Sequence, residues 1–291
     1  MSTLVSTLVS TPFIRSFHHH SIKTMTTSSS PPSAQDQFDE QTSRRIETLY
    51  LTPDVVAQRE AVLAMLMPRD GERALDIGCG PGLTTAALGL AVGESGAVVG
   101  VDIAEPMLAL ARTRCKAMSQ VAFTLTDVTA LPYPDASFDL ALATQVYEYV
   151  EDIDGALAEL ARVVRPGGRA LLVDTDWESA VWASSDDARM RRILDTWNEH
   201  IPHPHLPRDL KRRLQQAGFS ALRVEIVPLL NVTYDPNTYS VGMMHVIGNF
   251  VSGRNGLSEQ DVADWKADAR KMGDADAYFF SLNRYVFIAS K

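Results

Sequence analysis

The chain has 291 residues, of which 45% are hydrophobic and 22% charged, and its formal net charge is −9. This length suits one large or two modest domains, and the composition is that of an ordinary globular protein. The negative charge argues against nucleic acid or an anionic membrane surface as the main partner, because both are polyanions. No apolar run reaches the roughly 18 residues of a transmembrane helix, so we expect no stable membrane span.

Residues 1–35 differ in composition from the rest of the chain. They are rich in Ser and Thr, contain basic residues and histidines, and precede the first acidic residue, Asp36. This composition is typical of an organellar transit peptide and also of a plain disordered extension. We therefore predict a disordered or transit-like tail over 1–35 and a single domain over 36–291. We expect the protein to be cytoplasmic, or to be located in the mitochondrion or plastid if residues 1–35 act as a transit peptide.

The chain has only two cysteines, Cys79 and Cys115. Two cysteines provide no metal framework and indicate a reducing compartment, so we predict no metal site. The sequence does not indicate an oligomeric state.

Hydrophobic spacing predicts alternating helices and strands. We expect helices at 43–66 (with a start at Thr52–Pro53), 83–92, 105–118, 153–164 and 208–217, and strands at 72–77, 97–102, 123–126, 138–143, 169–174, 222–232 and 278–288. Such alternation is typical of a parallel sheet with helices on both faces. Residues 177–207 and the mostly helical insert 235–275 interrupt this order, and we expect them to form a lid on the substrate side.

The most informative segment is a glycine loop between two acid-ended strands. Asp76 ends the first strand, glycines follow at 78, 80 and 82, and Asp102 ends the second strand. Glycines let the backbone turn sharply and approach a ligand, and an acid after the second strand suits a ribose diol. The spacing D-x-G-x-G-x-G differs from the G-x-G-x-x-G of dinucleotide enzymes. Asp76 at the loop would also repel a pyrophosphate.

Five motifs occur in order along the chain: Leu75–Gly82, Val101-Asp102, Thr126-Asp127, Phe138-Asp139-Leu140 and Arg165-Pro-Gly-Gly168. In this order the chain resembles class I S-adenosylmethionine-dependent methyltransferases over about residues 45 to 232. The small-molecule group of ubiquinone and menaquinone biosynthesis is the most similar in its motifs. The resemblance implies an α/β fold with a Rossmann-like, seven-stranded, mostly parallel sheet whose last strand is antiparallel. It also implies S-adenosyl-L-methionine as cofactor and a small-molecule substrate.

The resemblance also implies roles for individual residues around the cofactor. The first acid and the glycine loop face the methionine half, the second acid binds the ribose, and the third acid accepts from the adenine amino group. Apolar side chains pack on the adenine, polar residues after the fourth strand lie near the sulfonium, and the N-terminal helical segment covers the site. The implied cofactor residues are Tyr50, Arg59, Asp76, Gly78, Cys79, Gly80, Gly82, Asp102, Ile103, Met107, Asp127, Val128, Thr144 and Gln145.

The acceptor side is less defined, because the cofactor supplies the electrophile and the need for a base depends on whether the acceptor atom is C, O, N or S. Candidates follow the fourth and fifth strands, and others lie within the His-Ile-Pro-His-Pro-His segment at 200–205. The predicted catalytic residues are His200, His203, Asp176 and Tyr147, and the predicted substrate-binding residues are Glu148, Asp174, Trp177 and Trp182. Each of them also has a structural explanation, as a helix cap, a packed aromatic or a loop residue. The alternative function is a cofactor-binding assembly or regulatory protein without turnover.

Overall fold

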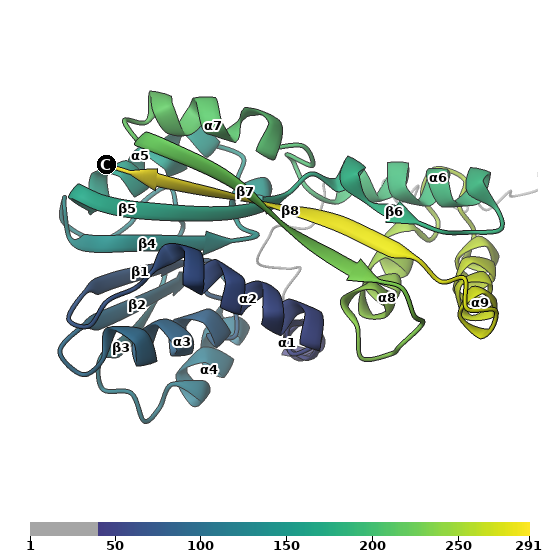
Figure 1. Cartoon of the computed structure of the whole chain (residues 1–291), viewed down its shortest axis with the longest axis horizontal. Helices are drawn as coiled ribbons and strands as arrows, with labels where there is room; N and C mark the ends of the chain where they lie inside the picture. Colours follow the sequence, from purple (N-terminus) through teal and green to yellow (C-terminus); the bar gives the residue numbers. More distant parts are fainter. Residues whose placement is uncertain (1–39) are drawn as a thin grey trace, which may run out of the picture. The chain divides into compact units, whose positions relative to one another are not determined.

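The computed structural model describes residues 40–291, and the predicted tail lies outside them (Figure 1). The strands are β1 (Arg73–Ile77), β2 (Ala97–Asp102), β3 (Val121–Leu125), β4 (Phe138–Thr144), β5 (Val164–Thr175), β6 (Val181–Trp182), β7 (Ser220–Asn231) and β8 (Phe280–Ser290). The α-helices are α1 (Glu40–Tyr50), α2 (Pro53–Leu66), α3 (Leu83–Val92), α4 (Glu105–Arg114), α5 (Ile153–Val163), α6 (Asp187–Trp197), α7 (Pro207–Gln216), α8 (Tyr239–Val251) and α9 (Glu259–Asp274).

All the strands of the described residues join one eight-stranded sheet in the order β3-β2-β1-β4-β5-β8-β6. Strands β5 and β6 pair with successive parts of one edge of β8, and β7 pairs with its other edge from Phe280 to Ser290. Strands β1 to β5 are parallel, and β8 is antiparallel to both β5 and β7. This arrangement confirms the predicted α/β class with an antiparallel last strand. The two-residue strand β6 is the one strand that the sequence did not predict.

The central strands are apolar on both faces, as a sheet covered by helices requires. Alternate residues of β5 illustrate this: Ala170 and Leu172 pack toward α5 and α7, whereas Leu171 and Val173 pack toward α2 and α3. A third apolar cluster lies beyond the sheet, where α6, α8 and α9 gather around the far ends of β7 and β8 (Figure 1). The two inserts therefore build a helical layer with a core of its own.

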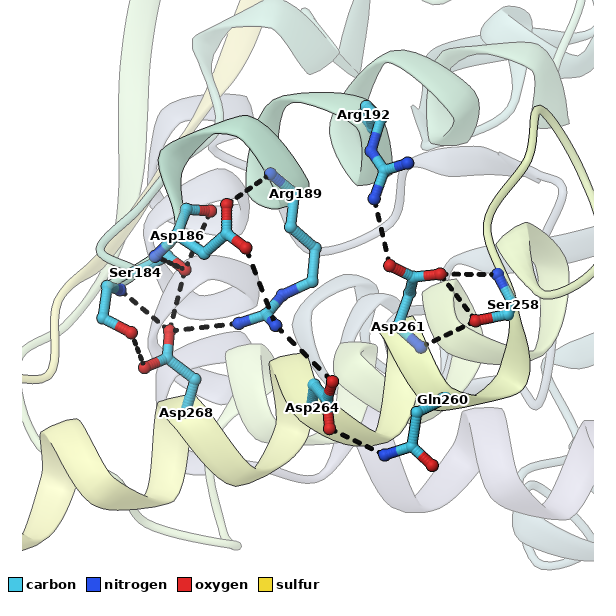
Figure 2. A network of polar contacts seen from close by, with 10 residues as sticks. Ser184, Asp186, Arg189, Arg192, Ser258, Gln260, Asp261, Asp264 and Asp268 are labelled. Carbon is cyan, nitrogen blue, oxygen red and sulfur yellow. Dashed lines mark hydrogen bonds and ion pairs between the residues drawn. The ribbon is translucent and has the colours of Figure 1, made fainter.

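Hydrogen bonds and ion pairs connect α6 and the residues before it to α9 within this layer (Figure 2). Asp268 on α9 accepts hydrogen bonds from the Ser184 hydroxyl at 2.8 Å and the Ser185 amide at 2.9 Å. Arg189 on α6 lies 3.8 Å from the Asp268 carboxylate, and Arg192 pairs with Asp261 at 3.0 Å. Because Asp268 is buried, these contacts are better shielded from water than surface pairs. They hold the two inserts together as one unit.

Several predicted boundaries were wrong. Helix α4 ends at Arg114 instead of 118, and β5 begins at Val164, before the predicted start at 169. Thr52 precedes α2 as predicted, but its hydroxyl donates to the Leu49 carbonyl at 2.8 Å and caps no helix amide. None of the helices within residues 40–291 combines the length and apolar character that crossing a membrane requires.

Candidate functional site

A cavity of about 570 Å³ lies at the carboxyl edge of the parallel strands. Asp76 lies near the end of β1, Asp102 ends β2 and Thr144 ends β4, and all three line the cavity. Parallel strands bring their carboxyl ends to the same edge of a sheet, which is where ligands bind in open α/β folds. The volume falls in the range typical of sites for small molecules and cofactors.

The glycine loop forms one wall of the cavity, and its three glycines have positive φ angles of 62°, 51° and 74° at Gly78, Gly80 and Gly82. A Cβ on Gly78 would lie 2.3 Å from Cγ2 of Val146, and a Cβ on Gly82 would lie 2.8 Å from Cβ of Ala111. A Cβ on Gly80 would meet no described atom within 4 Å. Gly80 therefore leaves its backbone open to a ligand.

Asp102, the last residue of β2, forms a hydrogen bond with this loop. Its Oδ2 accepts the Gly80 amide at 2.9 Å and its Oδ1 accepts the Ala104 amide at 2.9 Å. Each carboxylate oxygen has a second lone pair, so both can also accept from a ligand diol. Burial raises the pKa of Asp102 above its ordinary value, and the amide hydrogen bonds offset only part of this rise.

Asp76 lies beneath the loop and is 2% exposed. Its Oδ2 accepts a hydrogen bond from the Thr85 hydroxyl at 2.6 Å. Burial raises the pKa of Asp76 to about 7; the Thr85 hydrogen bond opposes the rise and the nearby Asp102 adds to it. A buried carboxylate with a raised pKa is well suited to a cationic ligand group, whose positive charge would favour ionisation.

Gln145 follows β4 in an unusual backbone conformation, with φ of 60°. Its amide donates to the Val173 carbonyl at 2.7 Å, and its side-chain Oε1 accepts from the Thr175 hydroxyl at 3.0 Å. Its Nε2 is buried without a partner among the described atoms, and the residue lines the cavity. A left-handed non-glycine residue with an unused donor is a feature of functional sites.

The residues of this cavity fit S-adenosylmethionine. The glycine loop provides an open backbone, Asp76 and Asp102 provide carboxylates, and Ile103, Met107 and Val128 provide apolar surface. Asp127 also lines the cavity and is exposed, with its Oδ1 accepting from the Thr129 amide at 2.8 Å.

Comparison with known proteins agrees with this geometry. The family model described as methyltransferase domain matches residues 75–172. The domain is that of a class I S-adenosylmethionine-dependent methyltransferase. S-adenosylmethionine is the cofactor of such a domain, as the motifs predicted.

Three curated relatives show how far the similarity extends. An uncharacterized 37.1 kDa protein in transposon TN4556 of Streptomyces fradiae is 35% identical, over 65% of this chain and 55% of the relative. Demethylmenaquinone methyltransferase of Tropheryma whipplei is 40% identical, over 40% of this chain and 47% of the relative. O-methyltransferase cnsE of Penicillium expansum is 35% identical, over 60% of this chain and 62% of the relative. The chain therefore spans less than two thirds of the length of each relative.

Solved structures show a similar fold over more of the chain than residues 75–172. The crystal structure of the [4+2]-cyclase SpnF is 22% identical with a TM-score of 0.53, covering 81% of this chain and 81% of that one. At this identity the likeness concerns the fold alone.

Most of the predicted cofactor residues meet in this cavity. The residues that line it are Tyr50, Arg59, Asp76, Gly78, Cys79, Gly80, Asp102, Ile103, Met107, Asp127, Val128, Thr144 and Gln145. Gly82 does not line it; this residue lies directly before α3, and a Cβ added to it would meet Ala111 of α4. Cys79 is buried, and burial raises the pKa of its thiol, so it stays protonated and acts as a small packed residue. Of the eight residues predicted for the acceptor side, Trp177 alone lines the cavity.

The predicted histidines lie outside the cavity. The ring of His200 stacks on that of Trp197 with centroids 3.6 Å apart, and burial lowers the pKa of His200 to about 3. His203 donates its backbone amide to the Glu148 carbonyl at 3.2 Å, and its Nε2 is buried without a described partner. His200 thus packs against a residue of the cavity wall, and neither His200 nor His203 lines the cavity itself.

The other acceptor-side predictions also fall short of the cavity. Tyr147 is fully buried in the sheet core, and Trp182 packs edge-on against Trp265 with centroids 5.1 Å apart. Asp176 is held by Arg208 at 2.7 Å and by His205 at 3.0 Å. Glu148 and Asp174 are buried behind the cavity wall and are considered below with Arg284.

Sequence reasoning missed five further residues that line the cavity. They come from the turn after β4, from α8 and from β8, and comprise Tyr149, Tyr239, Met243, Val246 and Arg284. Arg284 did carry a signal, because it occupies a buried alternate position of β8 between Leu282 and Val286. The remaining residues depend on how α6 and α8 pack over the sheet edge, which local pattern does not encode.

Proposed function

We propose that the protein transfers the methyl group of S-adenosylmethionine to a small molecule. The observation that carries the proposal is that one cavity contains both the glycine loop with its acids and an aromatic chamber. Trp177 and Trp197 enter it from segment 177–207, and Tyr239 and Met243 enter it from segment 235–275. Both inserts thus contribute walls to the acceptor end, which supports a lid role for them.

Within this proposal the chain binds, orients and excludes water. Asp102 accepts from the ribose hydroxyls, and Asp76 faces the amino group of the methionine half. Ile103, Met107 and Val128 pack on the adenine, with Asp127 accepting from its amino group. When bound, the cofactor supplies an electrophilic methyl group on a sulfonium, so alignment of the acceptor is the main task left to the protein.

The acceptor end provides little acid–base chemistry. No histidine of residues 40–291 lines the cavity. Burial raises the pKa of the Tyr50 hydroxyl to about 12, so the phenol stays protonated near neutral pH and does not provide a base. Burial also raises the pKa of Tyr149 well above its ordinary value. We therefore propose that the acceptor reacts in a form that is already ionised or that carries a neutral lone pair.

Methyl-labelled cofactor tests the proposal. The protein is incubated with labelled S-adenosylmethionine and a protein-free metabolite extract, and label is followed into new small molecules by mass spectrometry. We expect label transfer that depends on the extract. Binding of cofactor without any transfer would instead support the non-catalytic, cofactor-binding alternative.

The pKa of Asp76 predicts how cofactor affinity depends on pH. Ionised Asp76 attracts the ammonium of the cofactor, and its pKa of about 7 in the free protein means that binding must remove a proton at lower pH. Affinity for S-adenosylhomocysteine should therefore rise as pH increases through about 7 and then level off. Thr85→Val removes the hydrogen bond that lowers this pKa, so the midpoint should move to higher pH.

Calorimetry over a pH series measures both midpoints. The exposed Thr113, whose hydroxyl donates to a carbonyl of its own helix at 2.9 Å, provides the matched control Thr113→Val. A midpoint shared by wild type and Thr85→Val, or affinity that falls with rising pH, would contradict the role of Asp76.

A further inference from the structure

Arg284 is the feature of the cavity that cofactor binding does not explain. It lies on β8 opposite Thr175 of β5, is 3% exposed and lines the cavity. Its guanidinium donates to the Thr175 hydroxyl and, at 2.8 Å, to the Tyr239 hydroxyl. Thr175 in turn donates to Gln145 at 3.0 Å. A hydrogen-bonded row thus links Arg284 to Gln145, at the end of β4 beside the glycine loop.

The charge of Arg284 is not matched by a carboxylate partner. Within residues 40–291 its hydrogen bonds go to two hydroxyl groups, and its Nε is buried without a partner. Arg162 and Arg169, by contrast, each contact a glutamate at 2.7 Å and 2.8 Å. A buried cation without an ion pair is costly for a protein to maintain, and an anionic ligand would supply the missing partner.

Two buried acids lie near Arg284 but neutralise it poorly. Glu148 accepts the Thr175 amide at 3.0 Å, and Asp174 accepts the Glu148 amide at 3.4 Å. Burial raises the pKa of Glu148 to about 7, although Arg284 lowers it, and burial raises the pKa of Asp174 well above its ordinary value. Near neutral pH Glu148 is therefore only partly ionised, so the pair neutralises the charge of Arg284 incompletely.

Aromatic rings surround the guanidinium. Its central carbon lies 5.1 Å from the ring centroid of Tyr239 and 5.9 Å from that of Trp177. Tyr149 and Met243 line the same cavity. These walls favour a flat, largely apolar ligand, and the uncompensated guanidinium favours one that ends in an anionic oxygen. A cationic acceptor would be repelled by Arg284.

We propose that Arg284 binds an anionic oxygen of a flat, ring-bearing methyl acceptor, either an ionised hydroxyl or a carboxylate. The inference rests on the proposed function and names the substrate class of the same site. The guanidinium stabilises the oxyanion form, so an acceptor with an acidic hydroxyl needs no histidine base. Arg284 is then the residue that selects anionic acceptors over neutral molecules of the same shape.

Paired probes test this selection by calorimetry on protein saturated with S-adenosylhomocysteine. One pair is naphthoate and naphthamide, and the other is nitronaphtholate and its methyl ether; a naphthylmethylammonium ion serves as the cationic probe. We expect wild type to bind at least one anion about tenfold more tightly than its neutral partner, as one charge-assisted hydrogen bond implies. Which pair shows the preference distinguishes carboxylate from ionised hydroxyl.

Variants test whether Arg284 causes the preference for anionic over neutral probes. Arg284→Met should lose it while keeping its affinity for S-adenosylhomocysteine, and Arg284→Lys should keep part of it. Arg208→Met is the matched control, because Arg208 is half exposed and lies outside the cavity. Thermal unfolding checks that each variant folds; if Arg284→Met does not fold, the wild-type comparison alone decides.

The outcomes separate the two proposals. A wild type that binds neither anion more tightly than its neutral partner, or that prefers the cation, overturns the role of Arg284. A preference that survives in folded Arg284→Met overturns it as well. Failure of S-adenosylhomocysteine to bind wild type would contradict the proposed function instead.

Discussion

Asp102→Ala is expected to abolish tight binding of S-adenosylmethionine and of S-adenosylhomocysteine. The change removes the carboxylate proposed to accept from the ribose, and it also frees the Gly80 and Ala104 amides that Asp102 now holds at 2.9 Å. Hydrogen bonds to a charged group contribute about 1.5–3 kcal/mol each, so two lost bonds weaken binding by about 100-fold or more. Calorimetry with S-adenosylhomocysteine measures the loss directly.

Two further variants calibrate the result. Asp102→Asn keeps one oxygen acceptor and the shape of the side chain, so its loss of affinity should be smaller. Asp70→Ala removes an acid that precedes β1 at the opposite edge of the sheet, where it accepts from Ser95 at 3.1 Å, and should leave affinity unchanged. Unchanged affinity in Asp102→Ala would place the ribose elsewhere.

Gly80→Val is expected to abolish turnover while leaving most of the fold intact. The added Cβ meets no described atom within 4 Å, so the apo protein has room for it. The side chain would instead occupy space that the loop leaves open to the cofactor, and valine at φ of 51° adds strain to the loop. The measurements are methyl transfer, cofactor affinity and the midpoint of thermal unfolding.

Gly78→Ala is the matched comparison for Gly80→Val. Its single methyl group would lie 2.3 Å from Cγ2 of Val146, so packing between the loop and the residues after β4 must shift. We expect this smaller substitution to lower the thermal midpoint more than Gly80→Val does. Equal destabilisation by the two, or normal turnover in Gly80→Val, would contradict the view that Gly80 faces the cofactor.

The cofactor half of the site could be predicted from the sequence because local pattern encodes it. Asp76 and Asp102 end strands whose apolar runs are unambiguous, and the glycine spacing between them specifies a loop with positive φ angles. Parallel strand order then brings the two acids to one edge. The helices covering the sheet followed from the same alternation, with errors confined to their ends.

The acceptor half could not be predicted, because it depends on packing between distant segments. His200 was a plausible base by residue type, yet it stacks on Trp197 in the helical layer. Glu148 follows β4 and Asp174 lies near the end of β5, but both are buried and neither lines the cavity. Tyr239 and Arg284 reach the cavity from elements more than 50 residues later in the chain. The local signs of this site were Trp177, which was predicted and lines the cavity, and the lone cation within the apolar alternation of β8.

A crystal structure of the protein with S-adenosylhomocysteine tests the central claim most directly. We predict that the ribose hydroxyls lie within hydrogen-bond distance of Asp102, that the adenine lies between Ile103 and Val128, and that the amino group faces Asp76. The sulfur should then open toward Gln145 and the aromatic chamber in front of Arg284. A nucleoside bound away from Asp102, or a sulfur separated from that chamber by protein, would contradict the account.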